Sequence, residues 1–246
     1  MFSIFKKKYT VNNDFSRLST DMHSHLLPGI DDGSTDVNNS IELIKGLQEL
    51  GFKKFITTPH IFWDMYKNDA TTIEEARVEL KKEMDRSQQA TPLMTAAEYY
   101  LDDYFDGLLE KNTPLLTIKD MMVLVEFSFI APSANFKQQL FQLQIKGYQP
   151  VLAHPERYLY LSNNKKMFDE MKNSGCLFQL NLLSLTGYYG KPTADLAHYL
   201  IKMNYIDLLG TDLHHLRHLE ALRLSPAIMA PISTLLDSGR ILNPTL

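Results

Sequence analysis

Histidine and carboxylate side chains recur along this sequence in a pattern that suits metal binding. His23 and His25 are separated by one residue, and residues two apart on a β-strand project to the same side. Two imidazoles on one side can share one ion, because neutral imidazole is a common ligand of divalent metals. Side chains of the same kinds follow at Asp31, Asp32, His60, Glu98, Glu126, His154, Asp212 and His214. The set therefore predicts a metal centre.

Each of these side chains also has an ordinary structural interpretation. A histidine at the end of a strand more often completes the core than binds a metal. Glu98 and Glu126 could be helix caps or loop charges, and Asp31-Asp32-Gly33 could be a simple turn. Chance explains the whole set poorly, because five of the eight histidines and four carboxylates fall at successive ends of expected strands.

The elements that position these residues are short apolar runs that alternate with longer stretches of helical spacing. Strands are expected at 20–25, 54–58, 93–98, 121–127, 150–154, 177–182 and 206–211. Helices are expected at 37–50, 72–89, 103–111, 133–146, 165–173, 193–203 and 219–236. Such βα units predict an α/β fold, a single (β/α)7-type distorted TIM-like barrel whose strand ends meet at one face.

An open, doubly wound sheet is the alternative fold. To bind a dinucleotide it would need a glycine-rich phosphate turn after the first strand, whereas residues 23–29 read HSHLLPG. A length of 246 residues is long for an ordinary domain and normal for an α/β barrel. We therefore expect one barrel domain.

Composition excludes several classes of protein. Hydrophobic residues make up 44% of the chain and charged residues 22%, which is typical of a folded globular protein. A net charge of −4 provides no basic field for nucleic acid. We find neither a signal peptide nor a run of about eighteen apolar residues, and expect no integral membrane segment. The single cysteine, Cys176, excludes an internal disulfide and favours a reducing, cytoplasmic location.

Six motifs carry a resemblance to a known family: DMHSHLLPGIDDG at 21–33, TTPH at 57–60, AEY at 97–99, VEFS at 125–128, AHPER at 153–157 and GTDLH at 210–214. They resemble the PHP (polymerase and histidinol phosphatase) superfamily, and specifically its bacterial CpsB/YwqE-like tyrosine-protein phosphatases. The resemblance implies a PHP phosphatase domain at 19–246, a PHP-type barrel, and an N-terminal extension at 1–18.

The resemblance implies a site for three divalent ions. His23, His25, Glu98 and Asp212 would hold one ion, Glu98 would bridge to a second ion held by Glu126 and His154, and Asp32, His60 and His214 would hold the third. Asp31 has no metal role in this pattern and is interpreted as a turn residue or as a residue behind the ligands. Nitrogen and oxygen ligands without thiolate suit Mn²⁺, which we expect, and also iron, Zn²⁺ and Mg²⁺.

The activity that this resemblance implies is hydrolysis of phosphotyrosine. Three divalent ions outweigh four carboxylates, so the site should attract a phosphate dianion and supply a metal-activated hydroxide that attacks phosphorus. Arg157 and Arg217 are predicted to neutralise the phosphoryl oxygens, with a surface ion pair as the alternative for each. The implied substrate is a phosphotyrosine-containing protein, the C-terminal tail of a bacterial tyrosine kinase that regulates capsular or exopolysaccharide synthesis.

The sequence speaks against two other hydrolytic mechanisms and leaves two alternative functions open. A cysteine-dependent phosphatase needs an arginine six residues after its nucleophile, but Leu182 occupies that position after Cys176. No Gly-x-Ser-x-Gly elbow of a serine hydrolase occurs. A small-molecule phosphatase, such as a histidinol-phosphate phosphatase, remains the alternative enzyme. A non-catalytic binding module braced by metals is the alternative from another class.

Overall fold

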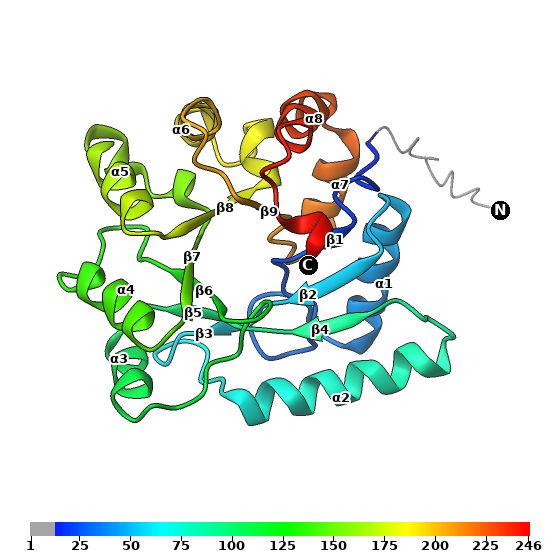
Figure 1. The fold of residues 1–246 in the computed structure, drawn as a ribbon. Coiled ribbons are helices and arrows are strands. Elements are labelled where there is room, and N and C mark those ends of the chain that lie inside the picture. The colour runs from blue at the N-terminus through cyan, green and yellow to red at the C-terminus, as the bar shows by residue number, and fades with distance from the viewer. Residues whose placement is uncertain (1–12) are drawn as a thin grey trace.

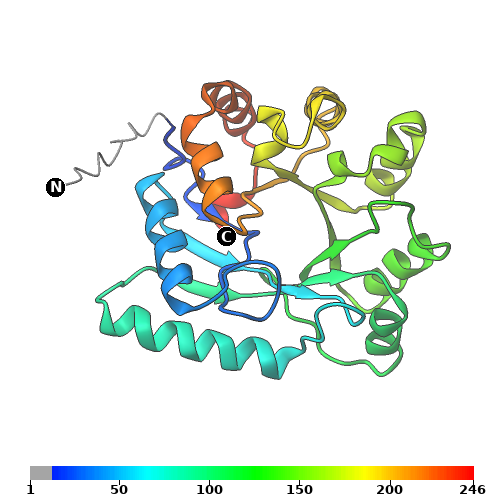
Figure 2. The same ribbon diagram turned by 180° about the vertical axis from the view of Figure 1, so that it is seen from behind.

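Parallel strands surrounded by helices make up the computed structural model, which describes residues 13–246 (Figure 1). The strands are β1 (Thr20–Asp21), β2 (Lys54–Thr57), β3 (His60–Ile61), β4 (Leu93–Thr95), β5 (Glu98–Tyr100), β6 (Met122–Glu126), β7 (Gln149–Ala153), β8 (Leu177–Asn181) and β9 (Leu208–Gly210). The helices are α1 (Val37–Glu49), α2 (Ala70–Arg86), α3 (Asp103–Glu110), α4 (Phe136–Ile145), α5 (Lys166–Asn173), α6 (Lys191–Lys202), α7 (Leu216–Leu224) and α8 (Met229–Asp237). The helices lie around the outside of the curled strands, as the opposite view also shows (Figure 2).

The strands form two sheets in which every neighbouring pair is parallel. One sheet has the order β1-β2-β4, and the other has the order β3-β5-β6-β7-β8-β9. The chain passes from β2 into β3 through Thr58-Pro59, and proline has no N–H to donate to a ladder. Backbone hydrogen bonds still pair the two linkers with the strands here, from Ala96 N to Thr57 O (2.9 Å) and from Glu98 N to Pro59 O (3.0 Å).

The expected fold is confirmed as α/β with parallel strands, but a single seven-stranded ladder is not shown. The expected strand at 93–98 is divided between β4 and β5, which belong to different sheets. Beyond β9, the six-stranded sheet meets the first sheet through one isolated parallel bridge, Ser24 with Leu213, supported by a hydrogen bond from His25 N to Leu213 O (2.9 Å). The result is a curled arrangement of two sheets.

Several helices differ from their expected bounds, and for two of them the local chemical reason is clear. The helix expected to begin at residue 72 begins at Ala70, because the Asp69 carboxylate accepts the N–H of Thr72 while the Thr72 side chain accepts the N–H of Asp69. The helix expected at 219–236 is divided into α7 and α8. Its break lies at Ser225, which precedes a proline and is extended, with φ −96° and ψ 93°.

Within residues 13–246, no single helix has the length and apolar character to cross a bilayer. Leu216–Leu224 and Pro226–Asp237 reach that length and composition only together, and they are bent by 70°.

Part of the expected N-terminal extension packs against the rest of the protein. Phe15 and Leu18 are fully buried, and the ring of Phe15 stacks on that of Phe52 at 5.3 Å between centroids. The Asn13 amide donates a hydrogen bond to the carbonyl of Ser225 (3.0 Å). Residues 1–12 lie outside the described part, and the division at residue 19 stays a prediction.

The strands pack tightly around Gly210 in β9, and a substitution at this position tests that packing. A Cβ at this position would lie 2.6 Å from Cβ of His23 and 2.7 Å from Nε2 of Gln179. We expect Gly210→Ala to lower the free energy of unfolding by about 1–3 kcal/mol in urea denaturation, the usual cost of overpacking. Gly107→Ala is the control, because no atom lies within 4 Å of its Cβ in α3, and it should gain about 0.5–1 kcal/mol. Equal stability of the two variants would contradict this packing.

Candidate metal centre

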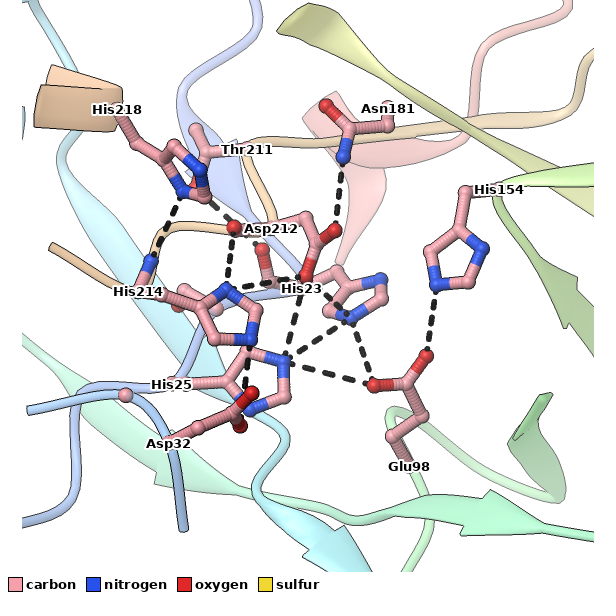
Figure 3. Close-up of polar contacts among 12 residues, drawn as sticks. His23, His25, Asp32, Glu98, His154, Asn181, Thr211, Asp212, His214 and His218 are labelled. Carbon is pink, nitrogen blue, oxygen red and sulfur yellow. Dashed lines mark hydrogen bonds and ion pairs between the residues drawn. The ribbon is translucent and has the colours of Figure 1, made fainter. Parts of the chain in front are cut away.

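All nine side chains predicted to bind metal converge at the carboxyl ends of the strands. The loop between β1 and α1 supplies His23, His25 and Asp32. His60 and Glu98 follow the carboxyl ends of β2 and β4 and are the first residues of β3 and β5. The end of β6 supplies Glu126, and the residues after β7 and β9 supply His154, Asp212 and His214. Figure 3 shows His25, Glu98 and Asp212, among others, pointing toward one another. Parallel topology explains the convergence, because all these strand ends open on one face.

The first group of ligand atoms surrounds one point. His23 Nε2 lies 3.2 Å from Glu98 Oε2 and 3.4 Å from Asp212 Oδ1. His25 Nε2 lies 3.5 Å and 3.4 Å from the same two oxygens, and 3.4 Å from His23 Nε2. Two ring nitrogens and two carboxylate oxygens thus face one another, an arrangement that a divalent cation satisfies.

Glu98 faces a second group with its other oxygen. Glu98 Oε1 lies 3.1 Å from His154 Nε2, and this nitrogen lies 3.5 Å from Glu126 Oε1. Because its two oxygens face two different sets of side chains, Glu98 has the geometry of a bridging carboxylate.

A third group lies nearer to solvent. Asp32 Oδ1 is 3.6 Å from His60 Nε2 and 3.6 Å from His214 Nε2. The side chain of Asp32 is 52% exposed, whereas those of His60 and His214 are only 12% and 14% exposed. This group therefore forms the open side of the centre.

Side chains behind the histidines fix the orientation of their rings. His25 Nδ1 donates to Asp31 Oδ2 (2.8 Å), and the same oxygen accepts the backbone N–H of His60 (3.1 Å). His23 Nδ1 donates to Gln179 Oε1 (2.8 Å). Such partners set which ring nitrogen faces a metal. Asp31 thus acts from behind the ligands, and Gln179 was missed because an uncharged amide within a strand gives no sequence signal.

Two of the candidate ligands have an uncommon backbone conformation. His154 has φ 31° and Asp212 has φ 50°, in the left-handed region that side chains other than glycine seldom adopt. The Asp212 N–H is held by the carbonyl of His23 (2.7 Å), and that of His154 by Gln179 Oε1 (3.3 Å). Local strain of about 1–3 kcal/mol per residue is typical of functional sites.

The electrostatics of the centre favour a bound cation. Burial opposes ionisation of Glu98, but the imidazoles of His23 and His60 outweigh it and hold the pKa of Glu98 well below its usual value. Burial, and then the charge on Glu98, raises the pKa of Glu126 well above its usual value. Burial lowers the pKa of His154 to about 4, so its imidazole is neutral and has a lone pair to offer.

The donor set fits divalent ions. It contains only nitrogen and oxygen ligands, and the buried Nδ1 of His60 has no hydrogen-bond partner in the described residues, although it lies 3.2 Å from Glu98 Oε2. A cation between two such atoms would satisfy both. How the nine side chains are divided among ions stays a prediction.

Arg157 lies in a cavity of about 250 Å³ at the mouth of the centre. Its Nη1 donates to Asp212 Oδ2 (2.8 Å), the oxygen that faces away from the first group of ligands. Its guanidinium lies 4.5 Å from the ring centroids of both Phe129 and Tyr189, which hold it between them. A planar, fixed guanidinium beside a metal centre is suited to bind phosphate.

Arg217, the second arginine predicted to act on phosphate, is exposed on α7 and does not line this cavity. The next residue, His218, lines it instead, together with His215. The reason is helical phase, because His218 is buried on the same face of α7 as Leu219 and Leu222, whereas Arg217 points away. The structure thus gives no support to a role of Arg217 at the cavity.

Cys176 lies apart from the centre. It is buried, it does not line the cavity, and burial raises the pKa of its thiol to about 12. A thiol of this kind is not a nucleophile at neutral pH.

Metal counting on two variants tests the arrangement around Glu98. Glu98→Ala removes oxygens from two groups of ligands, so we expect it to retain fewer ions than the wild type in elemental analysis. Asp31→Ala removes only the group behind His25, and should bind the same number of ions about 10–100-fold more weakly. Glu75→Gln, on the exposed face of α2, is the control for loss of one carboxylate charge. An unchanged ion count in Glu98→Ala would contradict a bridging role.

Comparison with known proteins agrees with the sequence motifs. Residues 19–228 match the profile of the capsular polysaccharide synthesis family CpsB/CapC. The chain is 30% identical to the tyrosine-protein phosphatase YwqE of Bacillus subtilis over 80% of this chain and 78% of that protein. It is 29% identical to the putative tyrosine-protein phosphatase CapC of Staphylococcus aureus, over 79% and 76% respectively.

A solved chain supports the same relationship. It comes from the crystal structures of YwqE from Bacillus subtilis and CpsB from Streptococcus pneumoniae, described as unique metal-dependent tyrosine phosphatases. It superposes with a TM-score of 0.75 at 29% identity, covering 82% of this chain and 84% of that chain. The chain described here belongs to the CpsB/CapC family.

Proposed function

We propose that this protein is a metal-dependent tyrosine-protein phosphatase, a phosphoric monoester hydrolase. The observation that carries the proposal is the convergence of nine side chains with nitrogen and oxygen donors, the buried Glu98 among them, beside a cavity that also holds Arg157. Relatives at 26–30% identity over most of the chain are named tyrosine-protein phosphatases.

We assign three divalent ions to the centre, with Mn²⁺ as the first choice and iron, Zn²⁺ and Mg²⁺ as alternatives. The proposed ligands are His23, His25, Glu98 and Asp212 for the first ion, Glu98, Glu126 and His154 for the second, and Asp32, His60 and His214 for the third. When bound, such ions supply an activated water nucleophile and positive charge opposite the phosphoryl oxygens. The protein holds the rings of His23 and His25 through Gln179 and Asp31, so the ligands need little rearrangement.

Arg157 is the residue that we assign to the phosphoryl group. The guanidinium lies over the rings of Phe129 and Tyr189, and Asp212 holds one nitrogen, so the remaining N–H groups have a fixed direction. Guanidinium N–H groups match the oxygens of phosphate and stabilise the charge that develops there during hydrolysis. Phe129 is 47% exposed and lines the same cavity, where it can contact the ring of a phosphotyrosine.

We further propose a cytoplasmic location, and a phosphotyrosine-containing C-terminal tail of a bacterial tyrosine kinase as substrate in capsular or exopolysaccharide synthesis. The family description, capsular polysaccharide synthesis, supports this assignment. The two sheets are proposed to act as one distorted (β/α)7 barrel of the PHP type. Backbone hydrogen bonds through the linkers at Thr57–Pro59 and Ala96, and the contact of His25 N with Leu213 O, support this arrangement. Hydrolysis of histidinol phosphate in preference to a phosphotyrosyl peptide would instead favour the small-molecule phosphatase.

Activity should depend on metal and not on thiol. We expect a chelator to abolish hydrolysis of a phosphotyrosyl peptide, and added Mn²⁺ or another divalent ion to restore it, because the carboxylates of the cavity repel phosphate when no cation is bound. Cys176→Ser should retain activity, since this thiol is buried and outside the cavity. An active chelated protein together with an inactive Cys176→Ser variant would refute the mechanism.

The two arginines should differ in their effect on turnover. Arg157→Ala is expected to lower kcat at least about 10²-fold, the usual loss for removing one donor to the transition state. It should keep its ions, because Asn181 Nδ2 still donates to Asp212 Oδ2 (2.8 Å). Arg217→Ala, on the exposed side of α7, should lose far less. Steady-state kinetics and elemental analysis of both variants provide the measurement, and a larger loss in Arg217→Ala would reverse the assignment.

A further inference from the structure

His218 is a buried residue that lines the cavity and has no role in the proposed metal centre. It lies in the first turn of α7, only 8% exposed, and Figure 3 shows it beside His214 and Asp212. Its ring packs edge to face against the rings of Tyr188 (5.1 Å between centroids) and His214 (5.7 Å). These contacts hold the imidazole in one orientation.

The contacts of His218 determine which ring nitrogen carries the proton. The backbone N–H of His214 donates to His218 Nδ1 at 3.4 Å. A ring nitrogen that accepts a hydrogen bond uses its lone pair, so the proton of the imidazole lies on Nε2. Within residues 13–246, no acceptor contacts this Nε2, and it is not among the fully buried polar atoms. Because His218 lines the cavity and its Nδ1 is occupied by the His214 N–H, Nε2–H is the donor that this ring has free for a ligand there.

Recognition of a phosphoryl group in this cavity requires hydrogen-bond donors. A phosphoryl group presents only acceptor oxygens, while the cavity wall includes the carboxylates of Asp32, Glu126 and Asp212, which also accept. Arg157 is the only lysine or arginine among the residues that line it. A second N–H donor would therefore complete the recognition of a tetrahedral anion.

Of the two histidines on this side of the cavity, His218 is the better placed. The charged neighbours of His218 are Asp212 and Arg157, which lie at the base of the cavity. The charged neighbours of His215 are Arg217 and Asp32, on the exposed side, and His215 Nδ1 is occupied in capping α7 by accepting the N–H of His218 (3.3 Å).

We propose that His218 is a phosphate-binding residue, whose Nε2–H donates a hydrogen bond to a phosphoryl oxygen of the substrate beside Arg157. This inference rests on the proposed phosphatase function and adds a residue to it. His218 takes the place at the phosphate that the sequence alone assigned to Arg217.

The test uses the full-length protein loaded with Mn²⁺ and compares His218→Phe with His218→Gln. Phenylalanine retains the packing of a ring against Tyr188 and removes the donor, whereas the amide nitrogen of glutamine can replace Nε2–H. His198→Phe, at an exposed position of α6, is the matched control. The dissociation constant of inorganic phosphate is measured by calorimetry, together with metal content, thermal stability, and the kcat and KM for a phosphotyrosyl peptide.

We expect His218→Phe to keep its ions and its stability while binding phosphate about 10–100-fold more weakly, as for loss of a hydrogen bond to a charged group. His218→Gln should recover most of the affinity, and His198→Phe should match the wild type. Unchanged phosphate affinity in His218→Phe would overturn the proposal. Loss of ions in both His218 variants would also overturn it, because His218 would then act only by supporting His214. If the wild type neither binds phosphate nor hydrolyses the peptide, the proposed function itself fails. If the wild type is active and His218→Phe is equally active, only the role of His218 fails.

Discussion

Burial of several carboxylates at one place is the constraint on which this structure depends. Glu98 is fully buried, yet its two oxygens lie within 3.5 Å of ring nitrogens from four histidines, His23, His25, His60 and His154. A buried negative charge is costly unless positive charge or hydrogen bonds compensate it. Imidazoles do this for Glu98, but Glu126 lies in the same space and its pKa is raised by burial and by Glu98 itself. The protein thus concentrates negative charge that divalent cations can balance. The uncommon backbone conformation at His154 and Asp212 places these two side chains in the same group.

The convergence of the candidate ligands could be predicted from the sequence because strand ends are easy to recognise. A short apolar run followed by histidine or a carboxylate marks the end of a parallel strand, and parallel strands bring these ends together. The division of the strands between two sheets did not follow, because it depends on hydrogen bonding around Pro59 and Ala96, which periodicity does not express. Gln179 was also missed, since only the fold places its amide 2.8 Å from His23.

The arginine assignment shows a different limit. Arg217 and His218 are neighbours in the sequence, and about 100° of rotation along a helix separates the directions of their side chains. Counting residues after Asp212 cannot decide which of them faces the cavity. The apolar face of α7 decides it, because Leu219 and Leu222 must be buried and His218 lies beside them on that face. A chemical motif is therefore best combined with the phase of the helix that carries it.

Asp212 connects the candidate metal centre with the proposed phosphate site through its two oxygens. One oxygen faces His23 and His25, and the other accepts from Arg157 and Asn181. Because a single carboxylate takes part in both, a cation at the first group and an anion beside Arg157 are electrostatically coupled. Each lowers the cost of binding the other, and such coupling is reciprocal by thermodynamic necessity. Without cations the wall of carboxylates repels phosphate, and with them the same wall holds the positive charge that attracts it, so the affinity for metal and the affinity for phosphate are set by one group of residues.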